Sequence, residues 1–309
     1  MPLFSVILPL YNKADVLADV VAALAKQRLA ENCEVLFVDD ASTDGSVERL
    51  RALSSHLPLC RIVTNSQNAG PAIRLNQGGM MAMGKYLCLI DADVLIAPDA
   101  ALRMIDLLQR TGAQMIHGRT QTLTDAAARD AAPLIGSNPK ATVSDEPLMT
   151  VLDGGLARMG WVVEADLFRA AGGCDERVFI QDESIALRLA AISRRLITLD
   201  SVVANGPKAL FHQSGNRRQE HHDAFFAHFN LLNDRPALEP RLRRRLGRRC
   251  LSFAWKAVRA GTLKDGGGAI FSGYALATLG LTDAAPLLLE RIAHDMAALP
   301  NIRRPVTSP

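Results

Sequence analysis

The first 118 residues alternate short apolar runs with amphipathic segments, and this alternation restricts the fold more than any other feature of the chain. Apolar runs of strand length occur at residues 4–8, 35–38, 61–64, 85–90 and 114–117. Helical spacing of apolar side chains predicts helices over residues 14–27, after a cap at Ser42 or Thr43, from Pro71 onward, and over residues 98–111. Strands that alternate with helices form a parallel sheet covered on both faces, with ligands at the carboxyl ends of the strands. The sequence therefore predicts an α/β fold with a mostly parallel sheet flanked by helices.

The pattern changes after residue 118. Residues 119–150 have no clear period, which predicts a loop-rich insertion, and periodicity returns in a strand at 161–163 and in helices at 165–171 and 183–194. From about residue 236 the sequence favours a helical C-terminal extension. We expect one domain over residues 1–235, with halves at 1–118 and 119–235, and the extension over 236–309.

Composition excludes several classes of protein. The chain has 309 residues, of which 49% are hydrophobic, and its net charge of +3 argues against nucleic-acid binding. The five cysteines include no Cys-x-x-Cys pair, which favours a reduced compartment such as the cytoplasm. Residues 3–10 do not resemble a signal peptide, and no segment has the roughly 18 apolar residues that a membrane-spanning helix requires.

Acidic side chains follow two of the predicted strands. Asp91 and Asp93 come directly after residues 85–90, and Asp39 and Asp40 end the run at 35–38. In a parallel sheet these ends share one edge, together with Tyr11 after the first strand. Carboxylate oxygens suit Mg²⁺ or Mn²⁺, which retain water and substrate phosphates as further ligands. The alternatives are a solvated turn at Asp91 and Asp93, a packing role for Tyr11, and a helix-cap turn at Asp40.

Residues 3–217 carry a series of ordered motifs. They are Ser5-Val-Ile-Leu-Pro-Leu-Tyr-Asn12, Phe37-Val-Asp-Asp-Ala-Ser-Thr-Asp-Gly-Ser46, Asn68-Ala-Gly-Pro-Ala72 with Arg74 and Asn76, Asp91-Ala-Asp93, Phe168-Arg-Ala-Ala-Gly-Gly-Cys-Asp-Glu176 and Gln181-Asp-Glu183. This series resembles the family 2 glycosyltransferases of GT-A fold. The resemblance implies a Rossmann-like GT-A sheet with the helical extension appended to it. It also implies that residues 1–235 are a catalytic domain, with a nucleotide-binding half at 1–118 and an acceptor half at 119–235.

The resemblance also implies a role for individual residues. It assigns the nucleotide part of the donor to Pro9, Tyr11, Asp39, Asp40, Asn68 and Arg74, and the ribose or the outer shell of the metal to Asp91. It assigns Mn²⁺ or Mg²⁺ to Asp93, with His212 as a second contact to the metal or diphosphate, although a structural role for His212 remains open. Asp182 matches the general base. The chain departs from the family pattern at Cys174, Gln181 and Ser184, and the adjacent Glu183 is therefore a rival base.

These matches imply an inverting glycosyltransferase that moves one sugar from a nucleotide-sugar, expected to be a UDP-sugar, to a hydroxyl of a glycan or lipid-linked acceptor. A Gln-x-x-Arg-Trp signature of polymerising synthases is absent from the sequence. One alternative is a dehydrogenase, but no Gly-x-Gly-x-x-Gly follows the first strand. The other is an inactive GT-A-fold protein that binds carbohydrate or nucleotide.

The stretch from 241 to 259 carries eight basic residues and no acidic one, and its apolar side chains share a helical face. This composition predicts peripheral contact with an anionic membrane, at the inner face of the membrane. The alternative is a surface helix that packs its apolar stripe on the catalytic domain.

Overall fold

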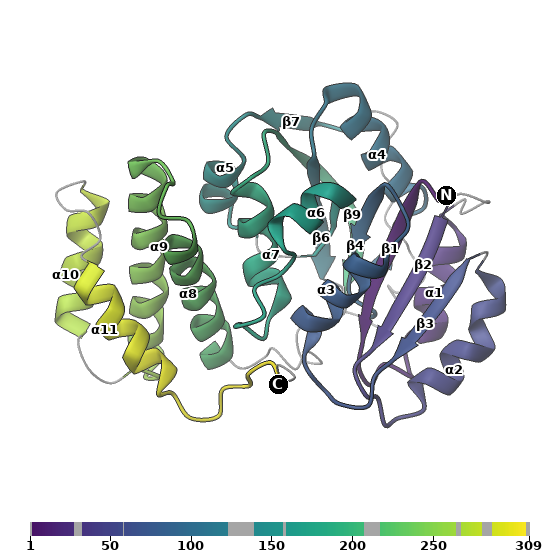
Figure 1. Cartoon of the computed structure of the whole chain (residues 1–309), viewed down its shortest axis with the longest axis horizontal. Coiled ribbons are helices and arrows are strands. Elements are labelled where there is room, and N and C mark those ends of the chain that lie inside the picture. Colours follow the sequence, from purple (N-terminus) through teal and green to yellow (C-terminus); the bar gives the residue numbers. More distant parts are fainter. Residues whose placement is uncertain are drawn as a thin grey trace.

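The computed structural model describes residues 2–27, 33–57, 59–122, 139–156, 159–206, 217–263, 267–279 and 286–306. Figure 1 shows a twisted sheet with its helices in one part of the molecule and a group of C-terminal helices beside it. Within these residues, no helix combines the length and the apolar character needed to cross a membrane.

The first half of the sheet is parallel, as the alternation predicts. Its strands are β1 (Phe4–Leu10), β2 (Cys33–Asp39), β3 (Cys60–Thr64) and β4 (Tyr86–Leu89), in the order β3-β2-β1-β4. The intervening helices are α1 (Leu17–Ala25), α2 (Ser46–Leu53) and α3 (Pro71–Met81), with a short 3-10 turn (Ser54–His56) after α2. Neighbouring residues of β1 enter opposite cores, since Ile7 faces α3 while Val6 and Leu8 face α1. The predicted fold class is confirmed.

The second half of the sheet mixes strand directions. Its elements are β5 (Leu95–Ile96), α4 (Ala100–Thr111), β6 (Met115–Thr122), β7 (Ala141–Ser144), α5 (Pro147–Gly154), β8 (Trp161–Glu164), α6 (Ala165–Ala171), α7 (Gln181–Ala190) and β9 (Leu196–Gly206). Strand β8 lies antiparallel between β4 and β6, while β6 runs parallel to β9. The short strands β5 and β7 both pair antiparallel with β9. The parallel arrangement therefore belongs mainly to the first four strands.

Two local expectations were wrong. Residues 119–150 are not simply loop, because β6 continues to Thr122, β7 forms, and α5 begins at Pro147; residues 123–138 lie outside the described part. Pairing with β9 supplies backbone hydrogen bonds that the sequence pattern does not reveal. Helix α2 begins at Ser46, behind Gly45 at φ +82°, so neither Ser42 nor Thr43 caps it. The Ser42 hydroxyl instead accepts the Asn12 N–H at 3.0 Å.

The C-terminal helices share a core with the sheet. They are α8 (Arg217–Asp234), α9 (Pro240–Arg259), α10 (Gly267–Thr278) and α11 (Pro286–Ala297). Buried side chains of α8, α9 and α11, such as Phe225, Leu246 and Met296, belong to the same cluster as Ile7 and Leu89 of the sheet. The division at residue 235 stays a prediction.

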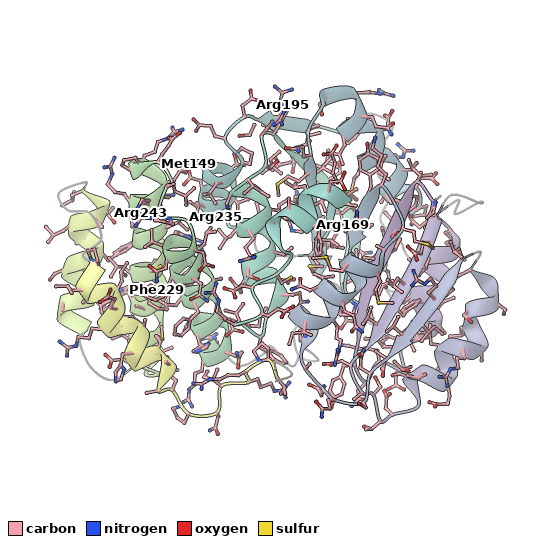
Figure 2. All side chains as sticks on the ribbon, in the orientation of Figure 1. Met149, Arg169, Arg195, Phe229, Arg235 and Arg243 are labelled. Carbon is pink, nitrogen blue, oxygen red and sulfur yellow. The ribbon has the colours of Figure 1, made fainter. Side chains whose placement is uncertain are left out.

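Much of the positive charge of α9 contacts the protein itself. Arg241 donates to Glu146 Oε1 at 2.7 Å, and Arg245 forms an ion pair with Asp153, which joins α9 to α5 and the turn before it. Arg243 donates to the Leu232 carbonyl at 3.0 Å, and Figure 2 labels it beside Arg235 at the end of α8. Helix α9 therefore packs on the part of the chain before residue 236, and membrane contact through 241–259 stays a prediction.

Candidate active site

The two carboxylates that follow β4 lie in contrasting environments. Asp93 is 8% exposed and forms an ion pair with the Lys13 ammonium, which the loop after β1 delivers. Its second oxygen, Oδ1, is buried and has no hydrogen-bond partner among the described residues. Asp91 accepts a 2.7 Å hydrogen bond from Gln181 Nε2 at the start of α7. Burial, and then the negative charge of Asp93, raise the pKa of Asp91 to about 7, while Lys13 and Gln181 act in the opposite direction.

These features fit a divalent cation. An oxygen that is buried without a donor is costly, and here a cationic side chain already faces the same carboxylate. The described residues contain no cluster of three or more His, Cys, Asp or Glu side chains that could hold a metal by themselves. One or two carboxylates with water and substrate phosphates are nevertheless the usual set for Mg²⁺. Asp93, with Asp91 beside it, would supply the protein's part of that set, and His212 lies outside the described residues.

Lys13 was missed by the sequence reasoning, although it directly follows the motif that ends β1. Its backbone N–H donates to Ser46 Oγ at 2.8 Å, and Asn12 Oδ1 accepts the Thr43 N–H at 2.8 Å. These contacts fix the loop after β1 against the loop after β2. Asn12 adopts φ +50°, a left-handed conformation that asparagine tolerates better than most residues. Tyr11, predicted to stack on the base, is partly exposed in the same loop.

Asp39 and Asp40 end β2 and are both buried, but their surroundings differ. Both oxygens of Asp40 are occupied: Oδ1 accepts from the Ala69 N–H and Arg74 Nε, each at 2.7 Å, and Oδ2 accepts from the Gly70 N–H at 2.9 Å. Among the described residues, the Asp39 carboxylate accepts a hydrogen bond only from the Ser42 N–H, at 3.2 to 3.3 Å. Asp39 therefore retains acceptor capacity for a ligand.

Arg74 and Asn68 hold the loop before α3. Arg74 also donates to the Gln67 carbonyl at 2.6 Å, and Asn68 donates to the Asp40 carbonyl at 3.2 Å. The structure brings both residues to the predicted donor end of the sheet. Through these hydrogen bonds Arg74 and Asn68 position the loop before α3, and their direct contact with the nucleotide stays a prediction.

Asp182 and Glu183 lie in the first turn of α7. The hydrogen bond from Gln181 to Asp91 brings this turn to the edge of the sheet that carries Asp91 and Asp93. The loop before α7 is held by Asp223 of α8, whose Oδ2 accepts the N–H groups of Phe179 at 3.1 Å and Ile180 at 2.8 Å. No sequence signal identified Asp223, because this role arises only from the packing of α8 against α7.

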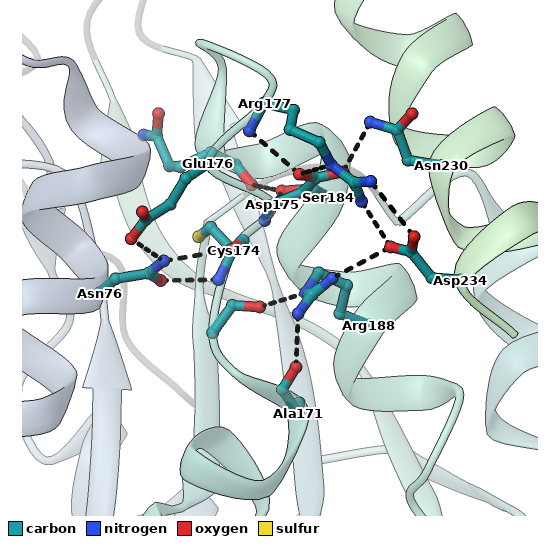
Figure 3. Close-up of polar contacts among 12 residues, drawn as sticks. Asn76, Ala171, Cys174, Asp175, Glu176, Arg177, Ser184, Arg188, Asn230 and Asp234 are labelled. Carbon is teal, nitrogen blue, oxygen red and sulfur yellow. Dashed lines mark hydrogen bonds and ion pairs between the residues drawn. The ribbon is translucent and has the colours of Figure 1, made fainter. Parts of the chain in front are cut away.

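A dense network supports this loop from the other side (Figure 3). Asn76 of α3 accepts the Cys174 N–H at 2.7 Å and donates to the Cys174 carbonyl at 3.1 Å and to Glu176 at 2.8 Å. Gly173 has φ +63°, and a Cβ there would lie 2.1 Å from Asn76 Oδ1, so only glycine fits. Asp175 accepts from Asn230 of α8 at 2.8 Å. The motif at 172–176 thus joins α3, α7 and α8 around the candidate base.

Glu183 is a partly buried acid with a displaced pKa. Burial, and then the charges of Asp223 and Glu220 on α8, raise its pKa to about 7, and Arg249 and Lys256 on α9 oppose the rise. The other acidic residue in the first turn of α7 is Asp182. Because the folded state keeps a proton that the unfolded state has lost, this carboxyl lowers stability as the pH rises from 4.5 toward 7.

We therefore expect Glu183→Gln to raise the stability of the protein near pH 8, by about 1–3 kcal/mol, and to have little effect below about pH 4.5. Urea unfolding at both pH values measures the difference, with Glu290→Gln on the exposed face of α11 as the matched control. An equal increase in the free energy of unfolding at both pH values would contradict the raised pKa of Glu183.

Comparison with known proteins matches this architecture to one family. Residues 5–142 match the family model for glycosyl transferase family 2. The succinoglycan biosynthesis protein ExoO of Rhizobium meliloti is 32% identical over 106 residues, which cover 34% of this chain and 29% of that protein. The chain spans less than half the length of the first curated relatives that it matches.

Two solved structures share the fold over 96% of this chain. S. aureus TarS 1-349 in complex with UDP-GlcNAc has a TM-score of 0.67 at 16% identity, with 88% of that chain covered. The mannosyltransferase PcManGT from Pyrobaculum calidifontis, in complex with GDP-Man and Mn²⁺, has a TM-score of 0.57 at 18% identity, with 86% covered. The chain thus has a GT-A fold, and its residues 5–142 match glycosyl transferase family 2.

Proposed function

We propose that this protein is an inverting glycosyltransferase that moves one sugar from a UDP-sugar to a hydroxyl of a glycan or lipid-linked acceptor, with a divalent cation at Asp93. The observation that carries the proposal is the hydrogen bond from Gln181 to Asp91, which supports it because Gln181 directly precedes the candidate base Asp182. UDP-GlcNAc in TarS and GDP-Man with Mn²⁺ in PcManGT support a nucleotide-sugar donor and a metal. The name of ExoO supports an acceptor in polysaccharide biosynthesis.

In this proposal Asp39 and Tyr11 bind the nucleoside, and the loop held by Asp40, Asn68 and Arg74 shapes its surroundings. Asp93 and Asp91 would hold the metal, which would offset the negative charge that grows on the leaving diphosphate. The Lys13 ammonium forms an ion pair with the Asp93 carboxylate, so it adds positive charge at the end of the sheet where the diphosphate would bind.

Asp182 accepts the proton of the acceptor hydroxyl as the hydroxyl oxygen attacks the anomeric carbon opposite the diphosphate. The new glycosidic bond forms as the bond to the diphosphate breaks, which inverts the anomeric centre. Asp223 and Asn76 act as positioning residues, because they hold the loops on either side of the base turn.

A donor screen tests the proposal. UDP-, GDP- and dTDP-sugars are each incubated with the protein and Mn²⁺, and both nucleotide release and the thermal unfolding midpoint are measured. We expect a UDP-sugar to give the largest shift, since a ligand at 100 times its Kd stabilises by ~2.7 kcal/mol. Binding without nucleotide release, in the presence of a range of hydroxyl acceptors, would instead indicate an inactive nucleotide-binding protein. The absence of any shift would overturn the donor assignment.

A further inference from the structure

Two cations of α9 share one helical stripe with an aromatic ring. Arg249, Phe253 and Lys256 follow the i, i+4, i+7 spacing that places side chains on the same face. The Arg249 guanidinium carbon lies 5.1 Å from the centroid of the Phe253 ring, and Lys256 Nζ lies 4.8 Å from it. The ring of His228 on α8 lies 5.2 Å from the same ring. We call Arg249 and Lys256 the α9 cation pair.

No acid of the described structure forms an ion pair with the α9 cation pair. This separates the two residues from Arg241 and Arg245 of the same helix, which pair with Glu146 and Asp153. Within the part of the chain that the structure describes, the buried Nε of Arg249 has no hydrogen-bond acceptor. Burial and the nearby Arg245 also lower the pKa of Arg249, so the fold holds this cation at a cost. An anion bound beside Arg249 and Lys256 would offset this cost.

The α9 cation pair lies next to the candidate base turn. Both cations interact electrostatically with Glu183, the residue that follows Asp182. Glu183 and Asp153 are the acids that act electrostatically on Arg249, and Glu220 and Asp223 of α8 act on Glu183 from the same region. Both Asp223 oxygens already accept hydrogen bonds, from Phe179, Ile180 and Gln219. Because Glu183 directly follows Asp182, the α9 cation pair is close to the turn that carries the candidate base.

We infer that the α9 cation pair binds a phosphate group of the acceptor and so selects acceptors that carry phosphate near the reacting hydroxyl. The inference rests on the proposed function and names its acceptor class. A guanidinium fork matches two phosphate oxygens, and an ammonium adds a point charge beside it. Phe253 keeps the two cations apart and oriented through their contacts with its faces.

The test uses glycerol 1-phosphate as the probe, on the full chain saturated with UDP and Mg²⁺ so that the donor site is filled. Calorimetric titration of the wild type is expected to show binding, and the double variant Arg249→Gln/Lys256→Gln is expected to lose on the order of 10- to 100-fold in affinity. The matched control is Arg244→Gln/Arg259→Gln, which removes the same charge from exposed positions of the same helix. Its affinity should equal that of the wild type.

Several outcomes would overturn the inference. These are absence of binding by the wild type, equal binding by the double variant, or an equal loss in the control. The pair would instead be assigned to a membrane surface under one result. In that result the wild type binds phosphatidylcholine–phosphatidylglycerol vesicles but not glycerol 1-phosphate, and the double variant no longer binds the vesicles. Lys256→Gln alone and Arg249→Lys cover the case in which the double variant fails to fold, because Lys256 is exposed and lysine preserves the charge. Lys256→Gln should weaken probe binding by itself, whereas Arg249→Lys should retain part of it.

The same variants separate this inference from the proposed function. The double variant should bind UDP-sugar and release nucleotide to water like the wild type, because neither residue contacts the strand-end carboxylates. If the donor screen fails while phosphate binding persists, the proposed function is wrong and the anion site stands. If the donor screen succeeds and phosphate binding is absent, only the acceptor class is wrong.

Discussion

Replacement of Asp93 by alanine is expected to abolish sugar transfer and to leave the fold intact. The substitution removes a buried carboxylate that forms an ion pair with Lys13 and whose Oδ1 has no hydrogen-bond partner among the described residues. Without it, the developing charge of the leaving diphosphate has no fixed cation, an effect worth several kcal/mol in metal-assisted transfer. Turnover in saturating Mn²⁺ and Mn²⁺ affinity in the presence of UDP are the measurements. Asp91→Ala should be severe but less complete, since Asp91 is engaged by Gln181.

The control for this result is Asp106→Ala, which removes a half-exposed carboxylate of α4 that pairs with Arg110 on the same helix. It should leave turnover unchanged. Full turnover by Asp93→Ala, or by the wild type in excess chelator, would show that transfer needs no metal at Asp93.

Asp182→Asn is expected to retain donor binding and to lose transfer by ~10²-fold or more, the usual contribution of a general base. The amide keeps the shape of the side chain but cannot accept the proton of the attacking hydroxyl. Single-turnover transfer measures the chemical step, and the thermal shift with UDP-sugar measures donor binding.

Glu183→Gln is the matched variant, one residue away in the same helical turn. It should have the milder effect on transfer, because Glu183 is directed into the charges of α8 and α9. If the two substitutions rank in the opposite order, Glu183 carries the proton.

The sequence anticipated much of the fold and of the donor end of the sheet. Helical spacing and strand-length apolar runs are local properties, so β1 to β4 and the start of α3 at Pro71 were predicted within a few residues. The meeting of Asp39, Asp40, Asp91 and Asp93 at one edge followed from the parallel topology, because all parallel strands end on the same side.

Contacts between distant parts of the chain were decided only by the tertiary structure. Lys13 and Asp93 are 80 residues apart, and Gln181 and Asp91 are 90 apart, so no local pattern links them. The antiparallel placement of β8 between β4 and β6 depends on backbone pairing, which many sequences satisfy equally well. Likewise, the basic composition of α9 was plain in the sequence, but the pairing of its cations was not. Across the residues that the structure describes, Arg241 and Arg245 form ion pairs with Glu146 and Asp153, whereas Arg249 and Lys256 form none. This division depends on which acids α5 and α8 bring near α9. The charge of a basic residue can be read from the sequence, whereas its neutralisation depends on the carboxylates that the fold brings near it.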